Sequence, residues 1–261
     1  MIGSVSLGKQ PVLGLTGERT LPGVEVENYW YRRHEAAYLA AADWLAPASR
    51  VLEAGLGEGY GAGMLAARGN TVVGLDYDAT ATAHARCHYP AVGVARGNVV
   101  ALPFRSASFD AVVSMQVVEH LWDQPRHVAE CARVLRPGGV LVLSTPNRLT
   151  FSPGYDPASG SPTNLFHTRE FSASELTGLL APHFPDTTRY GLRHGPRLCS
   201  LDGDLRHRHG QDLVTAQLAT PAADWSGDLL AAVASVTADD FSIALEDTDT
   251  ALDLIFVSRG P

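Results

Sequence analysis

Four polar side chains in the second half of the chain have the types and the spacing of a catalytic or metal-binding group. Gln116, Glu119 and His120 stand at positions i, i+3 and i+4, so on a helical turn they share one face. His167 lies beyond the next predicted strand. Two imidazoles and a carboxylate could hold a divalent cation such as Mg²⁺, with Gln116 or water completing the shell. Alternatively, His120 or His167 could act as a general base without a metal, or the group could only position a substrate.

A glycine-rich turn upstream has the features of a cofactor site. Gly55, Gly57 and Gly59 alternate directly after a short apolar strand. Glycine lets the backbone approach a ligand closely, and the helix that follows offers its N-terminal amides to a carboxylate or phosphate. Glu53 precedes the first glycine by two positions and could accept from a cationic amine. Asp76 closes the next strand, where a carboxylate can accept from both hydroxyls of a ribose.

This turn alone does not choose between two nucleoside cofactors. Gly57 and Gly59 followed by Ala62 also satisfy the dinucleotide fingerprint, and many nicotinamide enzymes carry an acid where Asp76 stands. Glu53 favours S-adenosylmethionine, because a dinucleotide fold normally places a packing residue there. Asn98, ahead of an apolar Leu-Pro-Phe run, favours it as well, since an amide can read an adenine edge while apolar groups cover its face. An NAD(P)-dependent oxidoreductase and a non-catalytic cofactor-binding module remain alternatives.

The elements that must position these residues alternate between strand and helix. Such alternation predicts an α/β fold, doubly wound and Rossmann-like, with a mostly parallel sheet of seven strands and helices on both faces. Helices are expected over residues 28–45, 64–67, 79–88, 124–136 and 172–181. A turn is expected at 137–139 and a loop at 150–165. Strands are expected over residues 50–54, 71–75, 92–95, 109–114, 140–144, 187–192 and 252–258.

The chain divides into a core with two additions. Residues 1–46 should form an irregular N-terminal arm and a helix that covers one end of the core. Residues 47–195 and 250–261 should form the Rossmann-like core itself. The segment 196–249 reads as a small insertion of loop and short helices before the last strand, and we expect it to cap an acceptor site.

Composition excludes several classes of protein. The formal charge of −8, with Lys9 as the single lysine and no basic run, argues against a nucleic-acid-binding protein. Three widely spaced cysteines fit neither a disulfide framework nor a thiolate zinc site. No apolar run approaches the roughly 20 residues of a membrane span, and no leader segment is evident. We therefore expect a cytoplasmic protein without membrane insertion.

The whole set of motifs resembles the class I S-adenosylmethionine-dependent methyltransferases. The resemblance is dense over residues 50–147 and is carried by the segments 51–61, 74–78, 98–104, 109–114, 118–121 and 135–139. It implies that the three loop glycines cradle the methionine portion of the cofactor. It further implies that Asp76 holds the ribose, that Asn98 lies near the adenine, and that Gln116 faces the sulfonium. Tyr77 and Val99, next to two of these residues, are expected to bind the cofactor as well.

A narrower resemblance extends over almost the whole chain. The segments 15–20, 27–30, 119–124, 144–148, 166–170 and 194–197 are similar to actinobacterial, mycobacterial-type methyltransferases associated with polymethylated polysaccharides such as methylglucose lipopolysaccharide. This likeness implies an O-methyltransferase whose acceptor is a sugar hydroxyl of an oligo- or polysaccharide precursor. Another small hydroxylated or lipid-like acceptor is the alternative, and a homodimer is left open.

Two further hypotheses concern the surroundings of the cofactor. The aromatic segment 29–34 could cover it, with Arg33 pairing its carboxylate, although an aromatic helix also suits the core. A pocket lined by Trp122, Tyr155, Phe166 and His194 could stack on a sugar face or enclose a lipid or quinone.

Overall fold

The computed structural model describes residues 19–245 and 248–260. The first eighteen residues of the expected irregular arm therefore lie outside the described residues. Of the described part, no helix is both long and apolar enough to cross a membrane.

The fold is built on one mixed sheet with the strand order β3-β2-β1-β4-β5-β8-β6-β7. The five strands from β3 to β5 run parallel, whereas β8 pairs antiparallel with both β5 and β6. The reversal of strand order between β1 and β4 opens a crevice at the carboxyl ends of these two strands. The strands are β1 (Arg50–Ala54), β2 (Thr71–Asp76), β3 (Gly93–Arg96), β4 (Phe109–Met115), β5 (Leu135–Pro146), β6 (Asp186–His194), β7 (Phe241–Ala244) and β8 (Asp253–Arg259).

The predicted fold class is confirmed, but within the described part of the chain the sheet has eight strands in place of the expected seven. The additional strand, β7, lies inside the segment predicted as an insertion of loop and helix, and it pairs antiparallel with β6 at the sheet edge. The turn expected at 137–139 is also absorbed into a strand. It lies within β5 next to a register shift opposite β4, where Gly138 has a φ of 74°.

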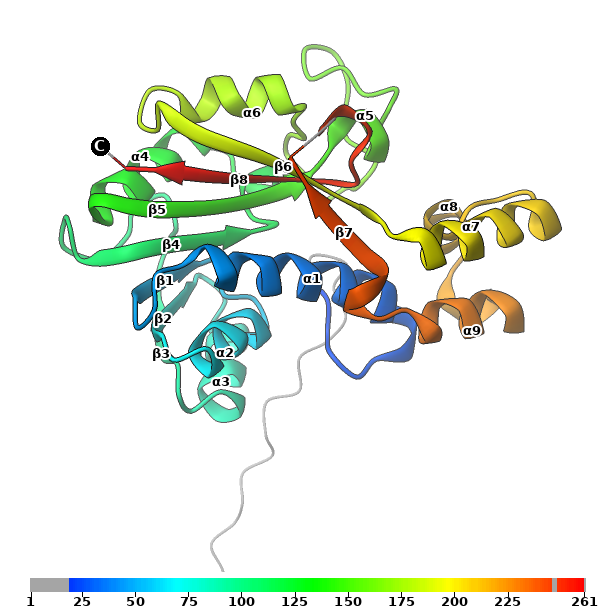
Figure 1. Cartoon of the computed structure of the whole chain (residues 1–261), viewed down its shortest axis with the longest axis horizontal. Coiled ribbons are helices and arrows are strands. Elements are labelled where there is room, and N and C mark those ends of the chain that lie inside the picture. The colour runs from blue at the N-terminus through cyan, green and yellow to red at the C-terminus, as the bar shows by residue number, and fades with distance from the viewer. Residues whose placement is uncertain (1–18, 246–247, 261) are drawn as a thin grey trace, which may run out of the picture.

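Helices cover both faces of the sheet (Figure 1), and the strands alternate accordingly. Val51 and Val113 pack on the side of α1 and α2, while their neighbours Leu52 and Val112 pack on the side of α4 and α6. The helices are α1 (Asn28–Trp44), α2 (Tyr60–Ala67), α3 (Ala79–His88), α4 (Gln124–Val134), α5 (Arg148–Phe151), α6 (Ala173–Leu180), α7 (Pro196–His209), α8 (Leu213–Ala219) and α9 (Gly227–Ser235).

Local sequence explains where several helices begin. The Ser172 hydroxyl accepts from the Glu175 amide, and the Glu175 carboxylate accepts from the Ser172 amide, so a capping box starts α6. Asp78 and Asp123 cap α3 and α4 through their side chains, which accept from the Thr80 and Arg126 amides. Helix α3 has the predicted bounds, whereas the short α5 falls at the start of a stretch read as loop. Helices α7, α8 and α9 gather beyond one end of the sheet (Figure 1).

Candidate active site

Two adjoining cavities lie at the carboxyl end of the parallel strands. The larger, of about 600 Å³, is called here the glycine-loop cavity, and the smaller, of about 220 Å³, the Trp30 cavity. Their shared wall consists of Arg19, Gln116, His120 and His167. The glycine-loop cavity is also lined by Gly55, Gly57, Asp76, Tyr77, Gly97, Asn98, Val99, Val117, Leu121, Trp122, Leu165, Phe166 and Thr168. The Trp30 cavity is also lined by Thr20, Glu27, Trp30, Arg33, His34, Glu119, Pro146, Phe151, Asn164 and Leu218.

The glycine turn forms the floor of the larger cavity. Gly55 and Gly57 have φ angles of 97° and 55°, in the left-handed region that favours glycine. The two residues differ in their surroundings: a Cβ on Gly55 would meet the Val117 side chain at 2.4 Å, whereas a Cβ on Gly57 would have nothing within 4 Å. Gly57 therefore faces open space that a ligand can fill. Its amide donates to Asp76 Oδ2 at 2.8 Å, which fixes the carboxylate at the rim of the same cavity.

The far end of the glycine-loop cavity contains the predicted amide. Asn98 follows β3, and its side-chain oxygen accepts from the Val100 amide at 3.0 Å, which holds the loop in a tight turn. The Val99 carbonyl lies within hydrogen-bonding distance, 3.2 Å, of Nδ1 of the buried His127 on α4. Burial lowers the pKa of His127 to about 4, so this histidine stays neutral beneath the loop.

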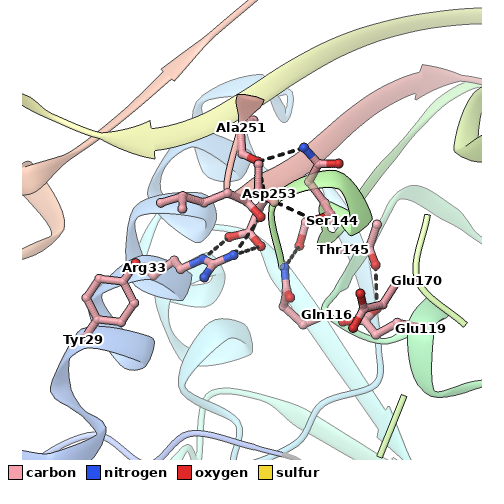
Figure 2. Close-up of polar contacts among 12 residues, drawn as sticks. Tyr29, Arg33, Gln116, Glu119, Ser144, Thr145, Glu170, Ala251 and Asp253 are labelled. Carbon is pink, nitrogen blue, oxygen red and sulfur yellow. Dashed lines mark hydrogen bonds and ion pairs between the residues drawn. The ribbon is translucent and has the colours of Figure 1, made fainter. Parts of the chain in front are cut away.

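The loop after β4 contributes Gln116, Glu119 and His120 to the predicted catalytic group, and Figure 2 shows the first two of them. Gln116 has a positive φ of 55°, and its side-chain nitrogen Nε2 donates to Ser144 Oγ on β5 at 3.1 Å. Glu119 lies in a 3₁₀ turn over Val118–His120 and is fully buried. Its Oε2 accepts from Thr145 at 3.1 Å, while its Oε1 has no partner. Burial raises the pKa of Glu119 to about 7.

Both histidines of the group have one ring nitrogen oriented by the protein. Nδ1 of His167 lies 2.7 Å from Oε1 of Glu170, and Nδ1 of His120 lies 3.0 Å from the Phe166 carbonyl. Because both partners are acceptors, each Nδ1 is a donor in the neutral ring, and each Nε2 then carries the lone pair. The Asn164 amide donates to Nε2 of His167 at 3.1 Å. The rings of His120 and His167 meet edge to face at 4.9 Å.

This arrangement suits a metal ion or a base. Ligand atoms of Glu119, His120 and His167 lie within 4.8 Å of one another, and they form the one such group found among residues 19–245 and 248–260. Metal-binding histidines usually donate their second ring nitrogen to a carboxylate or carbonyl, as both do here. Glu170 was not anticipated as part of the site, although its spacing of three residues from His167 was a usable signal.

The Trp30 cavity combines aromatic and polar walls. The rings of Trp30 and Phe151 meet edge to face at 6.3 Å, and Phe151 approaches the His167 ring at 5.9 Å. Glu27 and Asn164 supply polar groups, and Leu218 of α8 contributes from the predicted insertion. Sequence reasoning missed Glu27, Phe151, Asn164 and Leu218, which reach the cavity from distant parts of the chain.

The expected aromatic pocket is not formed as predicted. Trp122 and Phe166 line the glycine-loop cavity, where they are 89% and 45% exposed. Tyr155 is buried, and Nε2 of His194 forms a hydrogen bond of 2.7 Å with the Tyr29 hydroxyl. Tyr155 and His194 line neither cavity. The four residues therefore do not share one pocket.

Comparison with known proteins decides the family. A model of the methyltransferase domain matches residues 52–143. A Mycobacterium tuberculosis protein named "Probable S-adenosylmethionine-dependent methyltransferase" is 49% identical over 265 residues, which cover 99% of this chain and 93% of that protein. This chain belongs to the S-adenosylmethionine-dependent methyltransferases. A Mycolicibacterium smegmatis protein with the same description is 50% identical over 255 residues, covering 95% of this chain and 96% of that protein.

A solved structure supports the fold of this methyltransferase. The crystal structure of an S-adenosylmethionine-dependent methyltransferase from Thermotoga maritima superimposes with a TM-score of 0.60 at 19% identity, covering 89% of this chain and 93% of that one. At that identity the likeness concerns the fold alone. Family membership answers the question that the glycine turn left open: the cofactor is S-adenosylmethionine and the enzyme transfers its methyl group.

In this methyltransferase Arg33 is engaged in a buried ion pair. Its Nε donates to Asp253 Oδ2 on β8 at 2.6 Å, and its Nη2 donates to Asp253 Oδ1 and to the Leu252 carbonyl at 2.6 and 2.8 Å. Figure 2 shows the side chain reaching from α1 to β8. Arg33 is 2% exposed and lines the Trp30 cavity, not the glycine-loop cavity. These bonds anchor the covering helix to the sheet.

Glu53 of the methyltransferase lies behind the glycine turn and does not line either cavity. It is fully buried, Tyr38 of α1 donates to its Oε1 at 2.5 Å, and its Oε2 has no partner. Burial, with a smaller contribution from the Asp76 and Glu58 charges, raises the pKa of Glu53 to about 8. The carboxyl is therefore protonated in the folded protein at neutral pH.

Replacing Glu53 with glutamine should remove a pH-dependent loss of stability. Between the unfolded pKa of 4.5 and the folded pKa of about 8, the folded state binds a proton that the unfolded state does not, so stability falls as pH rises. The full window corresponds to about 5 kcal/mol, as an order of magnitude. We expect urea unfolding to show that the free energy of unfolding of Glu53→Gln, relative to that of the wild type, is larger at pH 8.5 than at pH 5. Parallel pH dependences of the two proteins would contradict this assignment.

Proposed function

We propose that this methyltransferase transfers the methyl group of S-adenosylmethionine to a sugar hydroxyl of an oligo- or polysaccharide precursor. The observation that carries the proposal is the shared wall between the two cavities, where His120 and His167 stand between the donor and acceptor spaces. The cofactor occupies the glycine-loop cavity, with its ribose at Asp76 and Tyr77 and its adenine at Asn98 and Val99. The acceptor enters the Trp30 cavity.

The walls of the Trp30 cavity support a sugar acceptor. Trp30 and Phe151 offer apolar aromatic surface to a sugar ring, while Glu27 and Asn164 offer polar groups for its hydroxyls. A volume of about 220 Å³ lies below the range of roughly 300–1,000 Å³ typical of ligand pockets, which favours entry of a single end unit of the acceptor.

The reaction is an in-line displacement. The acceptor oxygen attacks the methyl carbon, the carbon–sulfur bond breaks with its electron pair left on sulfur, and the hydroxyl proton must leave. His167 accepts that proton at Nε2 when the acceptor hydroxyl takes the place of the Asn164 amide, which donates to this nitrogen at 3.1 Å. Glu170 holds Nδ1 as the donor and balances the charge that forms. The remaining acceleration comes from holding the two reactants in contact.

A divalent cation is a second way to activate the hydroxyl at the same place. Glu119, His120 and His167 would hold it, and the unpartnered Oε1 of the buried Glu119 fits that need. Bound there, the ion would lower the pKa of an acceptor hydroxyl. The same residues serve in the metal-free mechanism and in the metal-dependent one. Measuring the activity of the purified enzyme in the presence of a chelator therefore distinguishes the two mechanisms.

Labelled cofactor offers the direct test of the acceptor class. The enzyme is incubated with methyl-labelled S-adenosylmethionine and gluco-oligosaccharides, with a hydroxylated quinone precursor as the competing acceptor, and the products are analysed by mass spectrometry. We expect label in a methyl ether of the sugar, with one equivalent of S-adenosylhomocysteine released. Methyl transfer to the quinone precursor alone would contradict the proposal of a sugar acceptor, but it would still agree with methyltransferase activity.

A further inference from the structure

Arg19, the first residue that the structure describes, lies at the rim of the glycine-loop cavity. Its Nη1 lies 2.9 Å from Asp78 Oδ2 at the start of α3, and the two side chains are only 14% and 26% exposed. Its neighbour Thr20 is within 3.1 Å of the Tyr60 hydroxyl at the start of α2 and 3.4 Å of His34 on α1. Arg19 and Thr20 are thus held against three helices beside the cofactor space.

The charge of Arg19 is unusual for its position. Among the described residues it is the only arginine or lysine that lines the glycine-loop cavity. The methionyl end of the cofactor carries a carboxylate, which a guanidinium can bind through a charge-assisted pair of hydrogen bonds. Arg33, the arginine predicted for that carboxylate, donates to Asp253 and the Leu252 carbonyl and faces the other cavity.

The position of the methyl group brings the carboxylate toward Arg19. For transfer to occur, the sulfonium must lie where the two cavities meet, and the methionyl carboxylate is only a few bonds from the sulfur. Arg19 lines both cavities and therefore stands at this junction. Arg19 pairs with Asp78, and the planar fork of a guanidinium suits bidentate binding of a carboxylate.

We propose that Arg19 binds the methionyl carboxylate of S-adenosylmethionine. The inference rests on the cofactor of the family and not on the identity of the acceptor. It gives the segment around Arg19 a positioning role in the donor site, where Arg33 was expected to act.

A pair of ligands that differ at the methionyl end tests the proposal. S-adenosylhomocysteine carries the carboxylate, whereas 5′-methylthioadenosine keeps the adenosine and sulfur but lacks the amino acid. By calorimetry, Arg19→Ala should lose about 10- to 100-fold in affinity for S-adenosylhomocysteine, the range for a lost charged hydrogen bond. Its affinity for 5′-methylthioadenosine should change less than about twofold. Arg19→Lys should fall between, because lysine keeps the charge without the fork.

Matched controls and outcomes make the result decisive. Arg68→Ala removes an exposed arginine paired with Asp43 at 3.3 Å and should bind both ligands as the wild type does. Equal losses of affinity for the two ligands in Arg19→Ala would mean that Arg19 has only a structural role, and this result would overturn the proposal. Unchanged affinity for S-adenosylhomocysteine would also overturn it. Thermal melting of each variant verifies that it is folded.

Limited proteolysis provides a second measurement on the wild-type enzyme. Trypsin can cut after Arg19, and the sites on either side of it are Lys9 and Arg32, so the product is recognised by its mass. Saturating S-adenosylhomocysteine should slow cleavage of the Arg19–Thr20 bond several-fold, and 5′-methylthioadenosine should not. Equal protection by both ligands would argue that the carboxylate plays no part.

Discussion

Replacing Gly57 with alanine should weaken the binding of S-adenosylhomocysteine by about 10- to 100-fold while the enzyme remains folded. A Cβ at this position meets no atom within 4 Å, and Gly57 lines the cavity assigned to the cofactor, so the added methyl group enters ligand space. Overpacking of this kind costs about 1–3 kcal/mol. Calorimetric titration of the purified variant provides the measurement.

The backbone at Gly57 requires a matched control, because φ is 55° and alanine is disfavoured there by about 1–2 kcal/mol. Gly69 supplies it: φ is 87°, a Cβ would again meet nothing within 4 Å, and the residue lies in the turn between α2 and β2, away from both cavities. Gly69→Ala should lose similar stability and keep its affinity. Equal affinities of Gly57→Ala and Gly69→Ala for S-adenosylhomocysteine would contradict the assignment of the cofactor to the glycine-loop cavity.

The core of the fold was predictable because its signals are local. The strand at 50–54, the acid at Asp76 and the helix at 79–88 each follow from a short apolar run, a turn or a cap, and the structure has them as expected. Strand β7 was missed for the opposite reason. It has four residues and follows Ala- and Leu-rich helices in the chain, and β6 is its one partner strand among the described residues. Its pairing is therefore defined by the sheet edge.

The site divides in the same way. Glu119, His120 and His167 were expected together because they follow neighbouring strands, and the structure brings them within reach of one ion. The partner of Arg33 is Asp253, which is 220 residues away, and no local pattern reports such a pair. The walls of the Trp30 cavity likewise come from α1, α5 and α8. Contacts of this kind depend on tertiary packing and required the structure.

Replacing His167 with alanine should lower kcat by about 100- to 10,000-fold, the usual contribution of a positioned general base. The expected loss follows from the position and orientation of the ring: Glu170 accepts from Nδ1, and His167 lines both cavities. Affinity for S-adenosylhomocysteine should change little, because the cofactor is held mainly by the glycine turn and Asp76. Steady-state kinetics and calorimetry on the same preparation separate the two quantities.

His207→Ala is the matched control, since this histidine is exposed on α7 and lines neither cavity. It should retain wild-type kcat. Free imidazole should partly restore His167→Ala if His167 acts as a base. If a cation activates the hydroxyl, chelator should silence the wild-type enzyme and Mg²⁺ should restore it, while imidazole alone should not rescue the variant.

Glu170→Gln distinguishes a catalytic His167 from a merely structural one. Glutamine can still accept from Nδ1 but cannot balance the charge of an imidazolium, so kcat should fall while KM for the cofactor stays near its wild-type value. A packing role would instead lower thermal stability and leave kcat of the folded fraction unchanged. A kcat within threefold of the wild type in His167→Ala would move the proton acceptor to His120, whose Nδ1 is held by the Phe166 carbonyl in the equivalent way.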